Sequence, residues 1–272
     1  MHSNFVLRPV HETAISYYSW QGVVSTSDWR HPGIQPSVVN AVIDVALMSE
    51  SGTTTDEFLL RWSLPADKFS GARRRSLLAR ALLRRMLVHT TGIPLRGWKF
   101  EAEPSGRLIV HNASCHRVPS ISLSHSGGWV AVAASDAGAI GIDIEVHRPH
   151  RNFNGIAAAA FGPDEQWLVA ADGAAGFYRI WTLKEAIAKA SGEGIAMVAD
   201  RTDRVAKGPR EGVWRGSIGE TPWLLAHATP VSGLSLAVAI RERSPFPRST
   251  PTGGVWAPVP DERGGPPETR LC

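Results

Sequence analysis

Length, composition and charge exclude several classes of protein. The chain has 272 residues, a hydrophobic fraction of 43% and a formal net charge of +4, which allow one large domain or two smaller ones. The longest apolar stretches, such as "WVAVAAS", are too short to cross a bilayer, and the N-terminus has no signal-peptide pattern. Cys115 and Cys272 are too few for a disulfide framework and lack metal-ligand spacing. We therefore expect a cytoplasmic protein.

The first third of the chain predicts a lead-in, a strand and two helices. Residues 1–37 are polar and contain "HPGIQP", which favours an irregular N-terminal extension. The β-branched residues of 38–47 predict the first strand. A short helix is expected over 53–65, and the clearest helix over 72–92, where Gly92 gives a stop signal.

The helix over 72–92 is strongly basic. Leu78, Leu82 and Met86 recur on one side, and we expect basic residues on the other sides. The basic run comprises Arg73, Arg74, Arg75, Arg80, Arg84 and Arg85. Such a run is typical of the solvated face of a helix; the alternative is a surface for phosphate or an acidic protein.

Strand signals dominate the middle of the chain and helix signals follow. Residues 97–110 predict a hairpin that turns at Ser105-Gly106, and 121–135 predict two strands joined near Gly127-Gly128. Two helices are expected next and three strands complete the pattern. The helices cover roughly 153–162 and 174–192, and the strands 212–219, 223–231 and 234–242.

The order of these elements predicts an α+β protein. The strands "GWVAVAAS" and "GLSLAVAIRE" each come late in a similar series, which suggests an internal duplication. We expect two similar α/β halves that form a pseudo-dimer, over 38–140 and 141–243. The Pro/Gly-rich residues 244–272 predict a disordered tail.

The strand "IGIDIEV", residues 140–146, carries two acidic residues. Ile140, Ile142, Ile144 and Val146 fall on one face of the strand, and Gly141, Asp143 and Glu145 fall on the other. Two neighbouring carboxylates repel each other and are costly to desolvate. A positive group between Asp143 and Glu145 is therefore expected.

The helix "FYRIWTLKEAIAKAS" supplies further charged residues. Its core stripe consists of Ile180, Leu183, Ile187 and Ala190. Glu185 and Lys189 share another face with Trp181, which we expect to pack behind the site, and Lys184 lies on its flank. Taken alone, Glu185 and Lys189 fit a surface salt bridge. Together with the strand, Asp143, Glu145 and Glu185 form a set of hard oxygen donors that suits Mg²⁺ beside phosphate.

Three motifs carry a family resemblance. "SLSHSGGWVAVA", "GIDIE" and "FYRIWTLKEAIAKASGEG" occur in the order and approximate spacing of the 4′-phosphopantetheinyl transferases. The resemblance is to the longer, pseudo-dimeric, surfactin-synthetase-activating type and covers roughly residues 38–243. The resemblance implies the pseudo-dimeric 4′-phosphopantetheinyl transferase fold. It also implies transfer of the phosphopantetheine arm of coenzyme A to a serine of an acyl or peptidyl carrier protein. Adenosine 3′,5′-bisphosphate would be released.

The resemblance also implies roles for individual residues. Asp143, Glu145 and Glu185 correspond to the Mg²⁺ ligands, and Glu185 or a metal-bound water takes the proton of the incoming serine. Lys189 corresponds to a lysine that contacts phosphate and stabilises or protonates the leaving group. Lys184 corresponds to a second lysine at the coenzyme A site, with salt bridging as its other possible role.

The expected coenzyme A contacts of the first half rest on the same resemblance. His125 corresponds to the histidine that contacts the 3′-phosphate, and Ser124 lies beside it. Arg107 in "SGRL" replaces the usual lysine of a Gly-Lys-Pro motif, and Arg75 aligns with a basic residue near the adenosine phosphates. The pseudo-dimeric type contains both halves of the cleft in one chain, which favours a monomer. We expect no nucleic-acid or membrane partner.

Three other functions are compatible with parts of the pattern. A Mg²⁺-dependent nuclease or phosphodiesterase also uses clustered carboxylates and a lysine, although there the lysine normally lies on a strand. A non-catalytic carrier-binding relative is the second alternative. A serine hydrolase using Ser124, His125 and Asp143 is disfavoured, because adjacent strand residues point to opposite faces and no G-x-S-x-G elbow is present.

Overall fold

The computed structural model describes residues 15–25, 38–49, 53–64, 74–103, 108–112, 118–135, 138–194, 205–207, 213–218 and 221–241. Across these ranges, no helix is long and apolar enough to cross a membrane. The strands pair antiparallel throughout. The predicted tail over 244–272 lies outside the described residues.

The first sheet has the strand order β1-β2-β6-β5. Its strands are β1 (Ile15–Ser25), β2 (Val38–Ser49), β5 (Ser120–Ser126) and β6 (Trp129–Ser135). The other elements of this half are α1 (Thr53–Trp62), α3 (Arg74–Thr91), the 3₁₀ turn η2 (Leu95–Gly97) and the hairpin β3 (Trp98–Ala102) and β4 (Leu108–Asn112). Apart from β1 and the 3₁₀ turn, these positions agree with the predicted strands, helices and hairpin.

Strand β1 corrects the prediction of an irregular lead-in. It pairs with β2 over eleven residues, from Ile15 opposite Met48 to Ser25 opposite Val38. The sequence "ISYYSWQGVVS" is rich in aromatic and β-branched residues, which favour a strand. The first sheet therefore begins before residue 38, inside the expected extension.

The second sheet has the strand order β7-β11-β10-β9-β8. Its strands are β7 (Ile140–Val146), β8 (Val205–Lys207), β9 (Val213–Ile218), β10 (Thr221–Val231) and β11 (Leu234–Arg241). Two helices, α4 (Phe153–Ala160) and α5 (Pro163–Ser191), lie between β7 and β8 in the sequence.

Helix α5 is longer than predicted. It starts at Pro163, whereas the sequence pattern predicted a helix only from 174. Gly173 has φ 58° and ψ −132°, so the backbone kinks there and two helical segments are joined. The predicted helix corresponds to the segment after this kink, and Gly192 ends it in the left-handed conformation.

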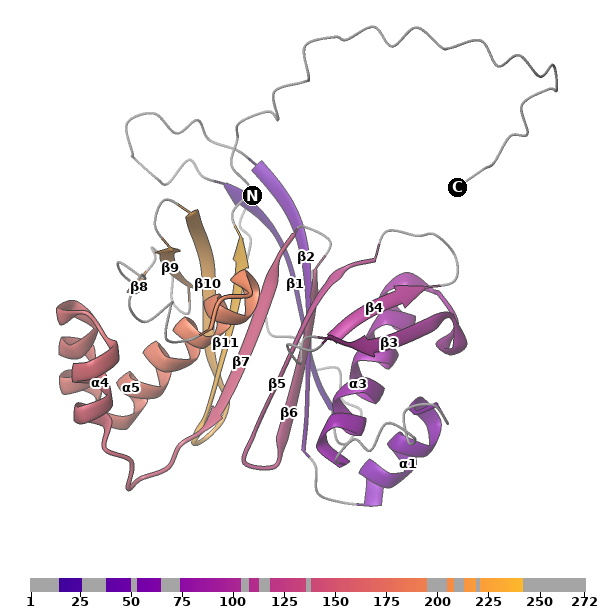
Figure 1. Cartoon of the computed structure of the whole chain (residues 1–272), viewed down its shortest axis with the longest axis horizontal. Helices are drawn as coiled ribbons and strands as arrows, with labels where there is room; N and C mark the ends of the chain where they lie inside the picture. Colours follow the sequence, from indigo (N-terminus) through magenta and orange to yellow (C-terminus); the bar gives the residue numbers. More distant parts are fainter. Residues whose placement is uncertain are drawn as a thin grey trace, which may run out of the picture.

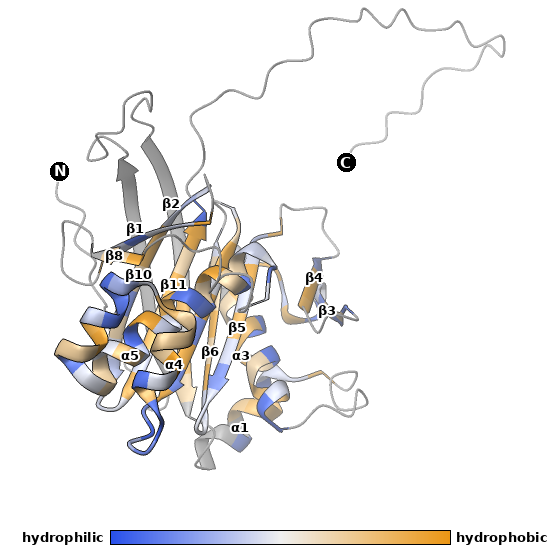
Figure 2. Cartoon of the chain, turned by 60° about the vertical axis from the view of Figure 1, so that its left-hand side comes forward, coloured by the Kyte–Doolittle hydropathy of each residue, from blue (hydrophilic) through white to orange (hydrophobic). Residues whose placement is uncertain are grey.

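The sheets form the middle of the molecule and the helices cover its outer faces (Figure 1). Helix α5 packs on the second sheet, and α3 packs on the first. A third apolar cluster, including Leu47, Ala131, Ile142 and Leu236, lies between the sheets. Figure 2 shows apolar residues along β10, β11 and the part of α5 turned to them. This arrangement confirms the α+β class, while the internal duplication and the boundary at 140/141 stay predictions.

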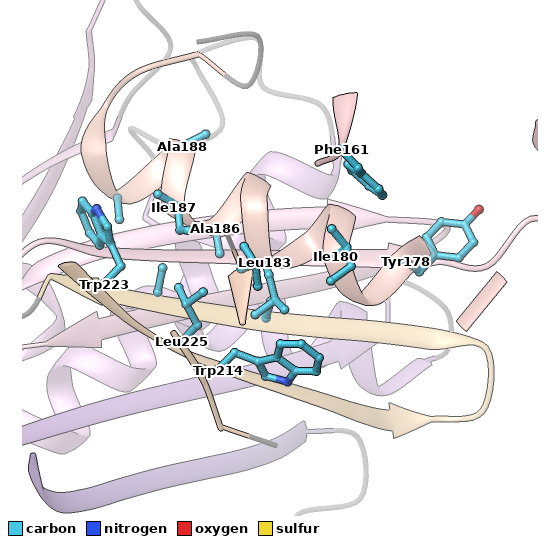
Figure 3. Packing of buried hydrophobic residues seen from close by; sticks show 14 of the residues in the cluster. Phe161, Tyr178, Ile180, Leu183, Ala186, Ile187, Ala188, Trp214, Trp223 and Leu225 are labelled. Atoms are coloured by element: carbon cyan, nitrogen blue, oxygen red, sulfur yellow. The ribbon is translucent and has the colours of Figure 1, made fainter. Parts of the chain in front are cut away.

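The predicted core stripe of α5 is buried against the second sheet. Ile180, Leu183 and Ile187 are fully buried and belong to one cluster with Trp214 and Trp223 (Figure 3). On α3, the predicted stripe is buried in the same way, in a cluster with Trp98. Burial of such apolar area is the main stabilising contribution to each sheet-helix layer.

One arginine of the basic helix departs from the prediction of a solvated face. Arg74 is exposed and lies 2.6 Å from Asp56, but Arg84 is 1% exposed. The Arg84 guanidinium donates to the Trp62 carbonyl at 3.1 Å and lies over the Phe100 ring at 4.4 Å. Its charge is therefore held by a carbonyl and an aromatic face and is not offered to solvent.

Candidate active site

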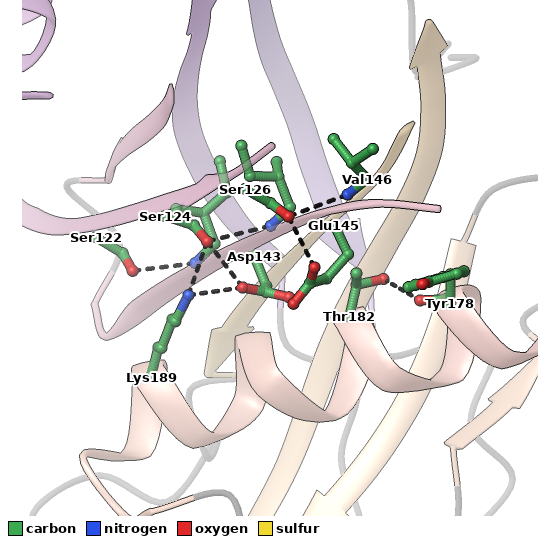
Figure 4. A network of polar contacts seen from close by, with 11 residues as sticks. Ser122, Ser124, Ser126, Asp143, Glu145, Val146, Tyr178, Thr182 and Lys189 are labelled. Atoms are coloured by element: carbon green, nitrogen blue, oxygen red, sulfur yellow. Dashed lines mark hydrogen bonds and ion pairs between the residues drawn. The ribbon is translucent and has the colours of Figure 1, made fainter. Parts of the chain in front are cut away.

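The two sheets meet where β5 runs beside β7. Backbone N–H groups of β7 donate to serine hydroxyls of β5. Three such hydrogen bonds occur: Ile142 N to Ser122 Oγ (3.0 Å), Ile144 N to Ser124 Oγ (3.3 Å) and Val146 N to Ser126 Oγ (3.1 Å). We call Ser122, Ser124 and Ser126 the serine ladder (Figure 4). Because β11 pairs with the other edge of β7, the ladder satisfies polar groups on the edge that faces β5.

Asp143 is the most enclosed of the predicted acidic residues, at 4% exposed. Its Oδ1 accepts hydrogen bonds from Lys189 Nζ at 2.6 Å and from Ser124 Oγ at 2.8 Å. Its Oδ2 is buried with no hydrogen-bond partner among the described residues. Burial raises the pKa of Asp143, and the nearby Lys189 opposes that shift.

Lys189 supplies the positive group that the sequence required. Its Nζ also donates to Ser124 Oγ at 2.9 Å, so this one ammonium contacts β5 and β7 from α5. The lysine side chain is 32% exposed. The Lys189 ammonium is thus partly accessible to solvent or to an anionic ligand.

Glu145 lies two residues along the same face of β7. Its Oε2 accepts a hydrogen bond from Ser126 Oγ at 2.8 Å, and the residue is half-buried. The predicted alternation is confirmed, because Ile142 and Ile144 are buried between the sheets while Asp143 faces Lys189.

Glu185 belongs to the same electrostatic cluster. Burial, chiefly, and then the negative charge of Asp143 raise the pKa of Glu185 to about 6; Lys189 acts in the opposite direction. Glu145 and Arg151 add smaller, opposing effects. The three predicted carboxylates are therefore close enough in space to influence one another.

The arrangement differs in one respect from the predicted metal site. Among the described residues, no three His, Cys, Asp or Glu side chains lie close enough together to hold a metal ion. Lys189 provides the charge that Asp143 needs. The donor set still fits Mg²⁺ chemically, because all the donors are oxygens and the buried Asp143 Oδ2 has no partner. A cation would also relieve the repulsion that raises the pKa of Glu185.

The structure does not bring Lys184 into this cluster. The Lys184 side chain is 1% exposed, and its Nζ lies 2.9 Å from Glu165 Oε2, also buried. The Glu165 carboxylate accepts the backbone N–H groups of Gly162 and Val205 as well. An ammonium enclosed in this way cannot reach a phosphate in this conformation, which corrects the predicted coenzyme A contact in favour of salt bridging.

The remaining predicted contacts lie in the first half. His125 is exposed on β5 between two buried ladder serines, so its accessible side chain lies on the face of the strand opposite the ladder. Arg75 is exposed in the first turn of α3. Arg107 lies outside the described residues.

Sequence reasoning missed two members of the ladder. It identified Ser124, but not Ser122 or Ser126, although "SISLSHS" places serine at every second position of a strand. On a strand this spacing puts the hydroxyls on one face. The packing of Arg151 was also missed: its guanidinium lies 4.9 Å from the Trp181 ring centroid and 5.2 Å from that of Phe177.

Comparisons with known proteins identify the class. Residues 139–239, which contain β7, α5 and the rest of the second sheet except the last two residues of β11, match the family model described as 4′-phosphopantetheinyl transferase superfamily. The second half of this chain therefore resembles that superfamily, in agreement with the resemblance of its motifs.

Individual relatives carry the same description. The chain is 36% identical over 129 residues to 4′-phosphopantetheinyl transferase psf-1 of Bacillus pumilus, covering 45% of this chain and 52% of that protein. It is 29% identical over 217 residues to 4′-phosphopantetheinyl transferase HetI of Nostoc sp., covering 78% and 86%. It is 45% identical over 75 residues to 4′-phosphopantetheinyl transferase AcpT of Salmonella typhi, covering 26% and 39%. The match thus spans about half of psf-1 and most of HetI.

Proposed function

We propose that this protein transfers the 4′-phosphopantetheine arm of coenzyme A to a serine of an apo acyl or peptidyl carrier protein. The match of residues 139–239 to the family model and the names of the relatives support this activity. The observation that carries it is the contact between Lys189 and Asp143, both inside the matched region, together with the contact of Lys189 with Ser124 of β5. This contact brings an ammonium to a cluster of acidic residues that share one surface of β7 and α5.

In the proposed reaction, the serine oxygen of the carrier protein attacks the phosphorus that bears the pantetheine arm. A new P–O bond forms, the diphosphate P–O bond breaks, and adenosine 3′,5′-bisphosphate leaves. Glu185, with a pKa of about 6, is mostly ionised at neutral pH and can accept the serine proton. Lys189 is partly exposed and can donate hydrogen bonds to the departing phosphate.

Binding of Mg²⁺ is part of the proposal. The Asp143 Oδ2 atom, which has no hydrogen-bond partner among the described residues, would be one ligand of the ion. The carboxylates of Glu145 and Glu185 would complete the set by moving closer to it than they lie in this structure. When bound, Mg²⁺ neutralises charge on the diphosphate and on the leaving phosphate. Lys189, Ser124 and Ser126 would keep the carboxylates oriented towards it.

Coenzyme A is proposed to bind through its phosphates. His125 would contact the 3′-phosphate and Arg75 the phosphates near adenosine, with Arg107 as a further cation. The exposure of His125 and Arg75 supports these roles, because a phosphate ligand needs an accessible donor. We further propose a cytoplasmic monomer, since both sheets contribute to the site from one chain.

The test is a transfer assay with the full chain. Purified apo carrier protein, coenzyme A and Mg²⁺ are incubated with the protein, and the mass of the carrier protein is measured. A gain equal to one phosphopantetheine group is expected, with none when the acceptor serine of the carrier is changed to alanine. No gain with any of several acyl and peptidyl carrier proteins would reject the proposal. Mg²⁺-dependent cleavage of DNA would favour the nuclease alternative instead.

A further inference from the structure

The three serines of the ladder differ in whether their hydroxyl groups donate a hydrogen bond to a carboxylate. All three hydroxyls accept a β7 backbone N–H, and all three serines are almost equally buried, with 7%, 7% and 8% exposure for Ser122, Ser124 and Ser126. They differ in where the hydroxyl proton points. Ser124 and Ser126 donate to carboxylates, whereas no carboxylate contact is recorded for Ser122 within the described residues.

The two donating serines match the two acidic residues in register. Ser124 contacts Asp143 and Ser126 contacts Glu145, both at 2.8 Å, and each pair is nineteen residues apart in sequence. A Ser-x-Ser segment on the first sheet thus faces an Asp-x-Glu segment on the second (Figure 4). Every second residue of a strand faces the same way, so this match follows from the spacing of both motifs.

The hydrogen bonds of Ser124 leave it no freedom to rotate. A hydroxyl has one donor and two acceptor positions. Ser124 donates to Asp143 and accepts from Lys189 Nζ and Ile144 N. Ser126 donates to Glu145 and accepts from Val146 N. Each hydroxyl is therefore fixed by the β7 backbone while it holds a β7 carboxylate.

We propose that Ser124 and Ser126 are positioning residues, which orient the Asp143 and Glu145 carboxylates for the ion and the diphosphate, whereas Ser122 serves only to join the sheets. This inference rests on the proposed transferase function. A carboxylate free to rotate would spend part of its time with both oxygens away from the ligand. Hydrogen bonds to a charged group restrict that rotation and are stronger than those between neutral groups.

The experiment compares Ser126→Ala with Ser122→Ala as its matched control. Both remove one hydrogen bond from a β7 backbone N–H at nearly equal burial, and only Ser126→Ala also removes a hydrogen bond to a carboxylate. Ser126→Thr keeps the hydroxyl and serves as the rescue variant. We expect Ser126→Ala to lower kcat about ten-fold and raise the Mg²⁺ concentration for half-maximal transfer by a similar factor. Ser122→Ala and Ser126→Thr should stay within about two-fold of wild type.

Two further measurements separate a positioning role from a structural one. Urea unfolding should give Ser126→Ala a loss of stability only modestly larger than that of Ser122→Ala, because Ser126→Ala also loses the hydrogen bond to the half-buried Glu145. Crystal structures should show the Glu145 carboxylate displaced only in Ser126→Ala. Equal kinetic losses in both alanine variants, or unchanged kinetics in Ser126→Ala, would overturn the inference while the wild type still transfers. An inactive wild type would instead reject the proposed function and, with it, the role of these serines in that reaction.

Discussion

Lys189 Nζ lies 2.6 Å from Asp143 Oδ1 and 2.9 Å from Ser124 Oγ, so one ammonium of α5 joins a strand from each sheet. Asp143 is 6% exposed as a side chain and Lys189 is 32% exposed. Asp143 is shielded from water and needs Lys189 to stabilise its charge, whereas the partly exposed Lys189 ammonium can also be stabilised by water. The contact links the candidate chemistry to the stability of the interface between the sheets.

Replacing Lys189 with methionine should remove that support. The buried Asp143 charge would lose its partner, and we expect the free energy of unfolding at pH 7 to fall by about 1–3 kcal/mol, less than for a fully buried pair because Lys189 is partly exposed. Urea unfolding measures the loss. A double variant with Asp143→Asn should recover part of it, and an additive result would show that the two residues are not coupled.

Glu185→Gln should abolish transfer and leave the fold intact. The amide is similar in size but cannot accept the serine proton or act as a carboxylate ligand, so we expect at least a hundred-fold loss, on the order of 3 kcal/mol in transition-state free energy. The mass of the carrier protein reports transfer, and circular dichroism reports the fold. Transfer at the wild-type rate by a folded Glu185→Gln protein would reject the role of Glu185.

The same substitution should change how stability depends on pH. Because the pKa of Glu185 rises from 4.5 to about 6 on folding, the folded state binds more protons than the unfolded state between these values. Stability should therefore be lost as pH rises from about 4.5 to above 6. Without metal, wild type should lose more stability than Glu185→Gln over this interval, as measured by urea unfolding in EDTA. Parallel curves for the two proteins would contradict the raised pKa.

Sequence patterns predicted most of the fold because the key segments have clear periodicity. The strand around Asp143 alternates strictly, and the stripe of Ile180, Leu183 and Ile187 fits one helical face, so both were located correctly. Strand β1 was missed because its neighbouring polar and proline-containing residues suggested an irregular segment. The start of α5 was missed because Gly173 interrupts the pattern at the kink.

Sequence patterns indicated that Asp143, Glu145 and Glu185 lie near one another, but not which contacts they make. Asp143, Glu145 and Glu185 do influence one another, as the spacing of their two elements suggested. That Lys184 points into the core was not predictable, because its partner Glu165 lies nineteen positions earlier on the far side of the Gly173 kink. The ladder partners come from two sheets, and period-two spacing alone does not say which strand they face.

Lys184→Met tests whether that lysine is structural. Glu165 would be left buried without a cation, and we expect a loss of about 3–5 kcal/mol in the free energy of unfolding. The KM for coenzyme A should stay within about two-fold of wild type in the folded fraction. Adding Glu165→Gln should restore part of the stability. A large rise in the KM for coenzyme A at unchanged stability would instead show that Lys184 contributes to coenzyme A binding.

His125→Ala should weaken coenzyme A binding without slowing chemistry. Among the described residues, no hydrogen bond or ion pair joins the exposed His125 ring to the carboxylates. We therefore expect KM for coenzyme A to rise about ten-fold while kcat stays within about two-fold. Dephospho-coenzyme A, which lacks the 3′-phosphate, provides the control. Wild type and His125→Ala should have equal KM values for it, whereas a remaining difference would assign His125 another role.

Gly141 sets how closely α5 approaches β7, and replacing it should disrupt both fold and site. A Cβ at this position would lie 1.9 Å from the Ala186 carbonyl oxygen and 2.7 Å from Ala190 N, both backbone atoms that cannot rotate away. Helix α5 would have to shift, which would move Lys189 from Asp143. We expect Gly141→Ala to cost about 3 kcal/mol or more.

Gly194→Ala is the control for this prediction, because a Cβ there has no neighbour within 4 Å in the part of the chain that the structure describes. Thermal unfolding should show a large decrease in Tm for Gly141→Ala and little change in Tm for Gly194→Ala. Transfer by any folded Gly141→Ala protein should also be weak, since the lysine and the carboxylate no longer meet. Wild-type stability in Gly141→Ala would mean that α5 lies farther from β7 than the structure places it, and the contact between Lys189 and Asp143 would then lose its basis.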